Sequence, residues 1–338
     1  MIGSVAARWL TETDLPPDVF AVVMATGIVS VAADDHRYPR ISVPLAVLAA
    51  AAFVVLGIGL VLRVLARPHS AAGELTDPDV ALCLFTSVAA CTVLGVRFDS
   101  HGAAVWLLGS LALFGWLVLT PLAIRDVLSR PRTQLRDHAH GAWLLPAVAT
   151  AGLAITAADL AIRAHASVLL VIAALLWLLA LLIYLAVTWL IAWRAVAGPI
   201  AADEVTPDSW ILMGALAISA LAGAHLEAGA RAMHVAGYLP WVRPLTIGVW
   251  ILAGLWIPVL LYAEIWTVER RLGALHYTRV WWSAVFPIGM YAAANSALAV
   301  QFQLRSLRTI SLVFFWVGFV VWLLVAVGLG QAFVRQRR

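Results

Sequence analysis

The feature that most constrains this chain is a succession of ten apolar stretches. Most approach the ~20 residues that an α-helix needs to cross a bilayer. Lipid offers no partners for backbone N–H and C=O groups, so stretches of this length favour helices over any open strand. The expected spans are 19–34, 43–62, 80–96, 102–124, 141–158, 166–193, 209–226, 245–266, 280–300 and 309–333.

Composition agrees with these stretches. Of the 338 residues, 63% are hydrophobic and 12% charged, and the mean hydropathy is +0.96. We therefore expect an all-α polytopic membrane protein, with one ten-helix transmembrane domain over residues 19–334. An N-terminal segment, residues 1–18, precedes it, and a basic tail, residues 335–338, follows. Because no residue is lysine, Schiff-base and P-loop lysine chemistry is excluded.

The arginines predict the orientation of the chain. Fourteen of them lie in the termini and in the loops after even-numbered stretches, against eight in the opposite loops. By the positive-inside rule both termini are then cytoplasmic, in a multi-pass protein of the cell inner (plasma) membrane. The pI near 9.5 indicates anionic lipid headgroups as partners rather than nucleic acid.

The stretches alternate in character, with a period of roughly 60 to 70 residues. Odd stretches are rich in small and weakly polar residues, whereas even stretches are bulky and hold ten of the 16 tryptophans. Small faces allow close approach or surround a cavity, while bulky faces fill space against lipid. We expect five helical hairpins, with the odd helices inside around a central hole and the even helices outside. An irregular bundle without an axial hole is the alternative.

The ninth stretch contains Phe286-Pro287. Pro287 has no N–H for the carbonyl of Ser283, so it predicts a helix kink. The residues beyond it are mostly small, among them Gly289 and Ala293. A kinked, small-faced helix with one large ring at its bend predicts a narrow passage that Phe286 closes. Ordinary tight packing against a neighbouring helix is the alternative.

Four motifs lie in order over nearly the whole chain. They are residues 15–30 (LPPDVFAVVMATGIVS), 143–149 (WLLPAVA), 210–215 (WILMGA) and 281–291 (WWSAVFPIGMY). Together they resemble the tellurite-resistance/dicarboxylate transporter family, which includes bacterial tellurite-resistance anion channels, fungal malate transporters and plant slow anion channels.

This resemblance implies ten helices as five hairpins around a central pore, with pseudo-five-fold symmetry, and homotrimers of independent pores. It also implies that Phe286 matches the family's phenylalanine gate. Pro146 and Pro287 are the expected helix kinks at the pore. One departure is Ala25, where the family more often has glycine.

Weakly polar side chains in odd stretches are candidates for the pore lining, because hydroxyl and amide groups can contact a partly dehydrated anion. The alternative is that each bonds its own helix backbone or a neighbouring helix. No charge lies near the centre of an odd stretch, which fits weak, low-specificity conduction. The resemblance implies small anions as the substrates, either C4-dicarboxylates such as malate or inorganic anions. The candidates are Thr26, Ser30, Thr86, Thr150, Ser219, Met290 and Asn295.

Carboxylates close three odd stretches on the predicted outer side: Asp34 and Asp35, Asp159, and Glu227. Surface ion pairs with nearby arginines are the simpler interpretation. The alternative function is a proton-coupled dicarboxylate carrier in which His225 or Glu227 titrates, because histidine changes charge near neutral pH.

The His138-Ala139-His140 motif precedes the fifth stretch. Without further cysteines or histidines nearby it predicts a solvated loop rather than a metal site, so we expect no metal and no cofactor. The chain has no recognisable catalytic motif, which leaves a polytopic membrane enzyme as a remote alternative. The expected partners are a small anion, membrane lipid and further copies of the chain.

Overall fold

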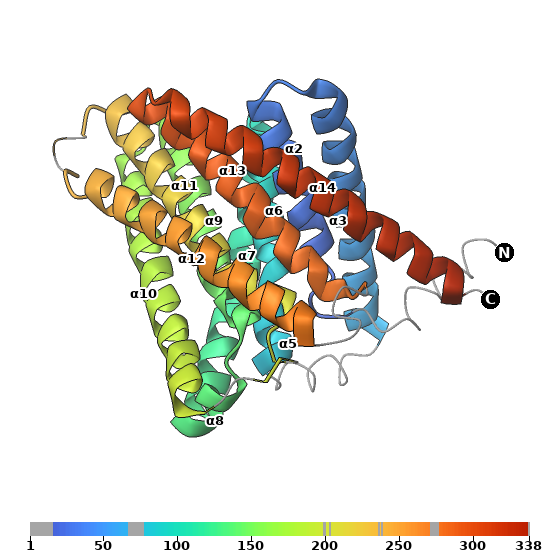
Figure 1. Ribbon diagram of the computed structural model, residues 1–338. Helices are drawn as coiled ribbons and strands as arrows, with labels where there is room; N and C mark the ends of the chain where they lie inside the picture. The colour runs from blue at the N-terminus through green and yellow to red at the C-terminus, as the bar shows by residue number, and fades with distance from the viewer. Residues whose placement is uncertain are drawn as a thin grey trace.

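The computed structural model describes residues 16–66, 78–198, 201–202, 204–235, 237, 239–270 and 277–336. Within these ranges the chain is helical and contains no strand (Figure 1). Residues 1–15 of the predicted N-terminal segment and 337–338 of the predicted basic tail lie outside the described part. So do two of the loop arginines that predicted the orientation, Arg67 and Arg271.

Every predicted stretch contains a helix, because an apolar segment in lipid can satisfy its backbone groups only internally. The long helices are α2 (Ala21–Asp35), α3 (Pro39–Ala66), α6 (Phe85–Arg97), α7 (Gly102–Leu128), α9 (Leu145–Ala164), α10 (Ser167–Ala197), α11 (Ile211–Ala232), α12 (Val242–Arg270), α13 (Trp282–Phe302) and α14 (Arg305–Gln336). Shorter elements are α5 (Pro78–Cys83), α8 (Arg132–His138), and the 3-10 turns η1 (Gly141–Leu144), η2 (Pro207–Trp210) and η4 (Arg279–Trp281).

Among the described residues, nine helical segments are long and apolar enough to cross a membrane. They include α5 and α6 taken together as one segment, Asp79–Arg97. The exception is α2, whose 15 residues rise about 22 Å, less than the ~30 Å of a hydrocarbon core. The protein is therefore a multi-pass membrane protein, and its first apolar stretch forms a helix that is short and almost wholly buried in protein.

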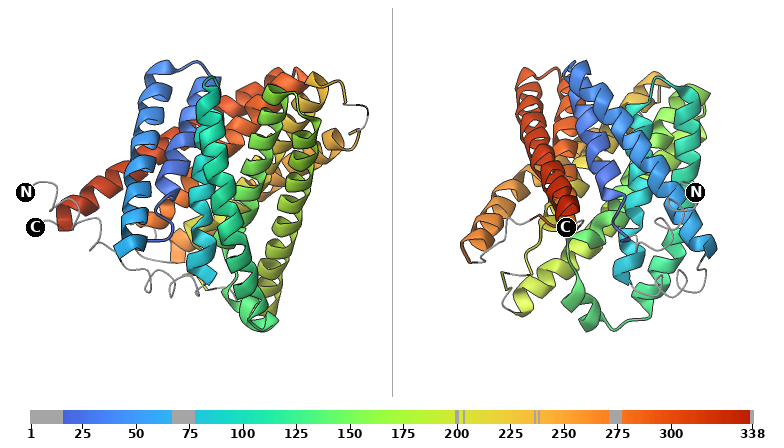
Figure 2. Two further views of the ribbon diagram at one scale, coloured as in Figure 1. Left: turned by 180° about the vertical axis from the view of Figure 1, so that it is seen from behind. Right: turned by 90° about the vertical axis from the view of Figure 1, so that its right-hand side faces the viewer.

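Burial separates the helices into two sets. In α6, α9, α11 and α13, between 67% and 89% of the most apolar segment is buried, against 22% to 33% in α3, α7, α10, α12 and α14. The small-residue helices are thus the buried ones, and the bulky helices cover them. Seen from behind, α3, α7 and α10 form the near face, with α14 beyond them (Figure 2).

Contacts among the buried helices run in a closed cycle. Helix α2 contacts α6, α6 contacts α9, α9 contacts α11, α11 contacts α13, and α13 contacts α2. Each is also joined by a short connection to a covering helix that it contacts, such as α2 to α3 and α13 to α14. These connections lie at one end of the bundle, the short-loop end, and α8 lies at the other, the α8 end (Figure 1).

Glycines at two helix contacts allow α13 to lie close to α2 and to α11. A Cβ on Gly289 of α13 would lie 2.9 Å from Cγ2 of Ile28 on α2. A Cβ on Gly214 of α11 would lie 2.8 Å from Cβ and Cγ of Pro287 on α13. Small residues at these positions therefore serve tight helix packing, as in other membrane bundles.

Candidate functional site

The five buried helices meet around a small central cavity. Each contributes a side chain to its lining: Ile28 from α2, Val93 from α6, Ile155 from α9, Ile218 from α11 and Met290 from α13. Its volume of about 10 Å³ is at the lower limit for one water molecule. Apolar side chains therefore fill the centre of the bundle almost completely at this level.

Phe286 lies four residues before Met290, so it occupies the same face of α13, about 6 Å nearer the α8 end. Its side chain is fully buried. The matching positions one turn before Ile28 and Ile218 are Met24 and Gly214. Phe286 is thus bulkier than the residues at the matching positions of α2 and α11.

The two predicted kink prolines differ in position. Pro287 lies inside α13, which continues through it. Pro146 is the second residue of α9, directly after η1. At the start of a helix the missing N–H removes no intrahelical bond, so Pro146 begins a helix rather than bending the middle of one. This position corrects the prediction of a kink inside the fifth stretch.

Most of the predicted pore-lining polar groups face other protein groups. Each of four covering helices donates an indole N–H to a buried helix, at 2.8 to 3.1 Å. The four bonds, which we call the tryptophan ties, run from Trp116 of α7 to Thr150 of α9, from Trp177 of α10 to the Ser219 carbonyl of α11, from Trp250 of α12 to Asn295 of α13, and from Trp322 of α14 to Thr26 of α2.

The remaining predicted lining groups also have partners. Thr86 donates to the Cys83 carbonyl at 2.7 Å, and Ser219 donates its hydroxyl to the Ala215 carbonyl at 2.7 Å. Ser30 donates to the Ser42 carbonyl and accepts from Arg97 Nε, both at 2.8 Å. Of the seven predicted side chains, Met290 is the one that lines the central cavity. Sequence reasoning missed its partners Ile28, Val93, Ile155 and Ile218, because it searched for polar atoms where the lining is apolar.

On three of the buried helices, α2, α9 and α11, the face that lines the cavity also carries an ionisable residue nearer the short-loop end. Asp35 lies seven residues after Ile28, Asp159 four after Ile155, and His225 seven after Ile218, spacings that keep each on its cavity-facing side. His225 Nδ1 lies 2.7 Å from Asp159 Oδ1, and the Asp35 carboxylate is near both His225 and Ser296. These three groups, which we call the vestibule residues, therefore lie together on the short-loop side of the central cavity.

The other carboxylates at this end are paired with arginines. Asp34 lies 3.5 Å from Arg97, Asp99 pairs with Arg163, and Glu227 pairs with Arg231 on its own helix. Glu227 therefore pairs with Arg231, whereas His225 pairs with Asp159. The two groups predicted to act in proton coupling belong to different clusters.

A partly buried network joins three segments at the α8 end. His140 Nδ1 lies 2.7 Å from Asp208 Oδ2, and its Nε2 lies 3.6 Å from Asp79, which accepts a hydrogen bond from the Trp143 indole at 2.7 Å. Burial by itself lowers the pKa of His140, but the bonds to Asp208 and Asp79 outweigh it and raise the pKa to about 9.

This network corrects the interpretation of His138-Ala139-His140 as a solvated loop. His138 is exposed at the end of α8 and contacts the Gln134 carbonyl, whereas His140 is an internal contact of the bundle. Across the described ranges, no three His, Cys, Asp or Glu side chains are grouped so as to hold a metal ion.

The structure therefore defines a multi-pass membrane protein in which five buried helices surround a small apolar cavity. The chain belongs to the SLAC1 voltage-dependent anion channel family, whose sequence pattern matches residues 14–329. This confirms the resemblance inferred from the four motifs. Family membership supports anion transport in general, and it indicates a channel or transporter rather than an enzyme.

Individual relatives agree with this class. An uncharacterized transporter of Methanocaldococcus jannaschii is 24% identical over 326 residues, which cover 90% of this chain and 90% of that protein. A second uncharacterized transporter of the same organism is 23% identical over 326 residues, covering 91% and 92%. An uncharacterized membrane protein of Mycobacterium tuberculosis is 32% identical over 146 residues, covering 43% of this chain and 74% of that protein.

Proposed function

We propose that this protein conducts small anions along the axis of the five buried helices, through a pore that Phe286 gates. In this proposal ten helices, α2 included, form five hairpins in a pseudo-five-fold ring, with the buried helices lining the pore. The substrates are C4-dicarboxylates such as malate, or inorganic anions, and they move down their gradient or with the membrane potential.

The observation that carries the proposal is the central cavity. Five helices from distant parts of the sequence each place at least one apolar side chain around it. Phe286, on the same helix face as Met290, adds a large, fully buried ring one turn away. A narrow apolar constriction holds an ion only weakly, and weak binding is what allows release and conduction.

The family resemblance and the arginine distribution support a proposed oligomeric state, membrane and orientation. The protein works as a homotrimer of independent pores in the inner membrane, with both termini in the cytoplasm. The short-loop end then faces outward, so an anion from outside meets the vestibule of Asp35, Asp159 and His225 before the constriction.

The test is anion flux into proteoliposomes that contain the purified full-length protein. Chloride, nitrate and malate are offered in turn under a set membrane potential. Phe286→Ala should raise flux severalfold, because truncation of the ring opens the passage beside Met290. The matched control is Phe315→Ala on α14, an equally buried phenylalanine that stacks on Tyr38 away from the axis.

Unchanged flux in correctly inserted Phe286→Ala protein rules out the gate. Equal increases for both phenylalanine variants point instead to a general loosening of the bundle.

The vestibule supports a second candidate function, a proton-coupled dicarboxylate carrier. His225 and Asp159 form a bonded pair on cavity-facing positions of two helices. If this pair carries a proton, malate flux requires a pH gradient, and His225→Gln abolishes that requirement while Glu227→Gln does not. Flux that moves no protons and ignores the pH gradient rules out the carrier.

A further inference from the structure

His140, Asp79 and Asp208, which we call the His140 network, join the segments that lead into α6, α9 and α11. The two ring nitrogens face different carboxylates: Nδ1 lies 2.7 Å from Asp208 Oδ2, and Nε2 lies 3.6 Å from Asp79 Oδ1. The side chain of Asp208 is 5% exposed, whereas that of His140 is 32% exposed. The charge of His140 therefore holds a buried carboxylate in place, and yet protons from solvent can reach the ring.

The contact between His140 and Asp208 is reinforced by the backbone. The turns η1 and η2 lie so close that a Cβ on Gly141 would overlap the Asp208 carbonyl. The Ala142 N–H also donates to Asp208 Oδ2, at 2.8 Å. Because both turns lead directly into helices, the start of α9 and the start of α11 are held as one unit.

Helix α11 connects this unit to Phe286. Gly214 lies less than two turns after Asp208, and a Cβ on it would lie 2.8 Å from Pro287, the residue that follows Phe286. The turn η2 also contacts α13 directly. Close-packed interiors transmit displacements instead of absorbing them. A shift at the start of α11 should therefore change the position of the Phe286 ring.

The other charged groups around His140 have partners of their own. They come from α8, from α10 and from the segment before η2. Arg136 pairs with Asp137, His138 contacts the Gln134 carbonyl, and Arg194 donates to the Ala139 carbonyl and pairs with Glu204. A change of charge at His140 therefore acts first on Asp79 and Asp208.

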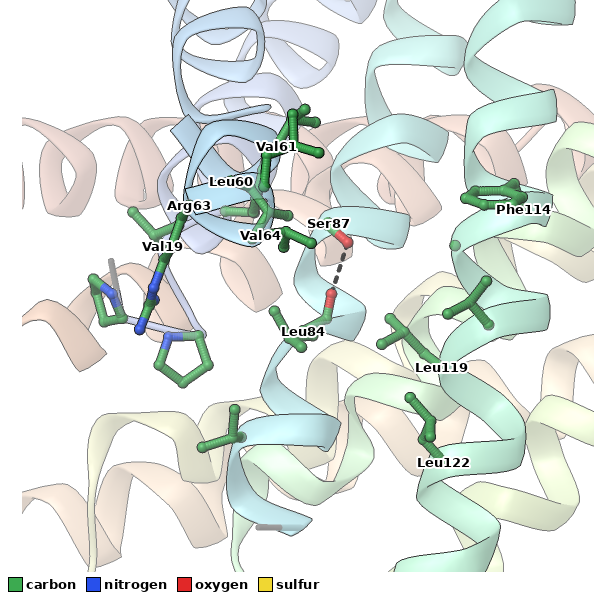
Figure 3. A pocket seen from close by; sticks show the side chains of 17 residues that line it. Val19, Leu60, Val61, Arg63, Val64, Leu84, Ser87, Phe114, Leu119 and Leu122 are labelled. Carbon is green, nitrogen blue, oxygen red and sulfur yellow. Dashed lines mark hydrogen bonds between the residues drawn. The ribbon is translucent and has the colours of Figure 1, made fainter. Parts of the chain in front are cut away.

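A larger cavity lies between α3, α6 and α7, on the outside of the bundle (Figure 3). Its volume is about 480 Å³, and its lining includes Val80, the residue after Asp79. The side chains of His140, Asp79 and Asp208 do not line it. The His140 network is therefore a contact between protein segments and not part of this cavity.

We propose that the His140 network positions the gate. Protonated His140 holds the start of α11 against the starts of α5 and α9, which keeps Phe286 in the axis, and loss of this charge releases α11 and raises anion flux. His140 is a positioning residue, because it does not line the central cavity. The inference rests on the proposed function and adds to it a control by pH at the α8 end.

The direction of the effect follows from the charge. Burial by itself lowers the pKa of His140, but the bonds to Asp208 and Asp79 raise the pKa to about 9. Release from the carboxylates returns this pKa toward its ordinary value near 6.5. The held state is therefore favoured at neutral pH and is lost as the pH rises past about 9.

The test is nitrate flux into proteoliposomes that contain the full-length protein, with the same pH on both sides. Nitrate keeps its charge over this range, and equal pH leaves no proton gradient. From about pH 7 to about pH 9.5, wild-type flux should rise at least about fivefold, the lower end of typical coupling between two sites. Wild-type flux that does not change with pH overturns the proposal.

Variants assign the pH response to one side chain. His140→Gln should show the higher flux at both pH values, because it carries no charge. His140→Arg stays charged and should show the lower flux at both, so it decides the question if His140→Gln does not fold. His138→Gln is the control, two residues away and exposed, and should keep the wild-type pH profile.

Phe286→Ala separates the network from the gate. His140→Gln should add nothing to the flux of Phe286→Ala, because the ring that the network positions is absent. If Phe286→Ala raises flux but the His140 variants behave like wild type, the network does not act on the gate and the proposed function stands. If the His140 variants change flux but Phe286→Ala does not, the gate assignment itself fails, and the route proposed here fails with it.

Hydrogen–deuterium exchange tests the network without any transport. At neutral pH, peptides that cover residues 207–214 should exchange faster in His140→Gln than in His138→Gln, because release of α11 exposes its first turns. Equal exchange in the two variants overturns the proposal, even if no variant conducts an anion.

Discussion

Gly214 illustrates how much one residue decides in this bundle. It lies on the face of α11 that also carries Ile218, and the ring of Pro287 occupies the space where its side chain would be. Pro287 in turn directly follows Phe286, so the contact sets the distance between α11 and the proposed gate. Small residues in the odd stretches thus allow neighbouring helices to pack closely, in addition to leaving space near the cavity.

Gly214→Ala should destabilise the protein by about 1–3 kcal/mol, the usual effect of an added methyl group in a filled interior. The added Cβ would have to lie 2.8 Å from two carbons of Pro287. Thermal unfolding in detergent measures the loss. Gly57→Ala on α3, where no atom lies within 4 Å, should leave the transition unchanged or slightly raised. Equal transitions for Gly214→Ala and Gly57→Ala would contradict the tight contact.

At the scale of elements, the tryptophan ties explain the alternation of bulky and small helices. Each of four covering helices bonds a buried neighbour through an indole, and the partner atoms are groups that sequence reasoning assigned to the pore. Thr26, Thr150 and Asn295 were correctly placed on buried helices but face outward to a covering helix. The sequence cannot show this, because the direction of a side chain depends on which helix packs beside it.

Loss of a tie should leave a buried polar atom without its partner. In Trp250→Phe the Asn295 side-chain oxygen loses its donor in a fully buried position. We expect a loss of about 1–3 kcal/mol from this unsatisfied acceptor. Trp189→Phe on α10, where the indole is 70% exposed, is the matched control and should unfold like wild type. If both variants unfold alike, the tie contributes nothing measurable.

At the scale of the whole molecule, the His140 network joins segments that are far apart in sequence. Asp79 precedes α6, His140 precedes α9, and Asp208 precedes α11, so one imidazolium holds the α8 ends of three buried helices together. The raised pKa of His140, about 9, keeps it protonated at neutral pH. Its ordinary value is near 6.5.

Stability should therefore fall as the pH rises. Because the folded pKa lies above the unfolded one, the contribution of His140 is complete below about pH 6.5 and is lost as the pH passes 9. The loss is on the order of 2 kcal/mol at this partly exposed site. Unfolding in detergent at pH 6.5 and 9.5 measures it. His140→Gln should remove this pH dependence and His138→Gln should keep it. The reverse pattern would show that the pH dependence does not come from His140.

The sequence by itself determined the class of membrane protein, the positions of the helices, the family, and the division into small and bulky helices. These follow from length, hydropathy and motif order, which are local properties of the chain. It also pointed to Phe286, because a large ring before a proline stands out among small residues.

Only the tertiary structure decided which side chains meet. The cavity lining, the partners of His225 and His140, and the tryptophan ties each combine residues from separate helices. Helix rotation and neighbour order bring such residues together, and neither is a property of any single stretch. The same reason explains why Glu227 and His225, two residues apart in sequence, belong to different clusters.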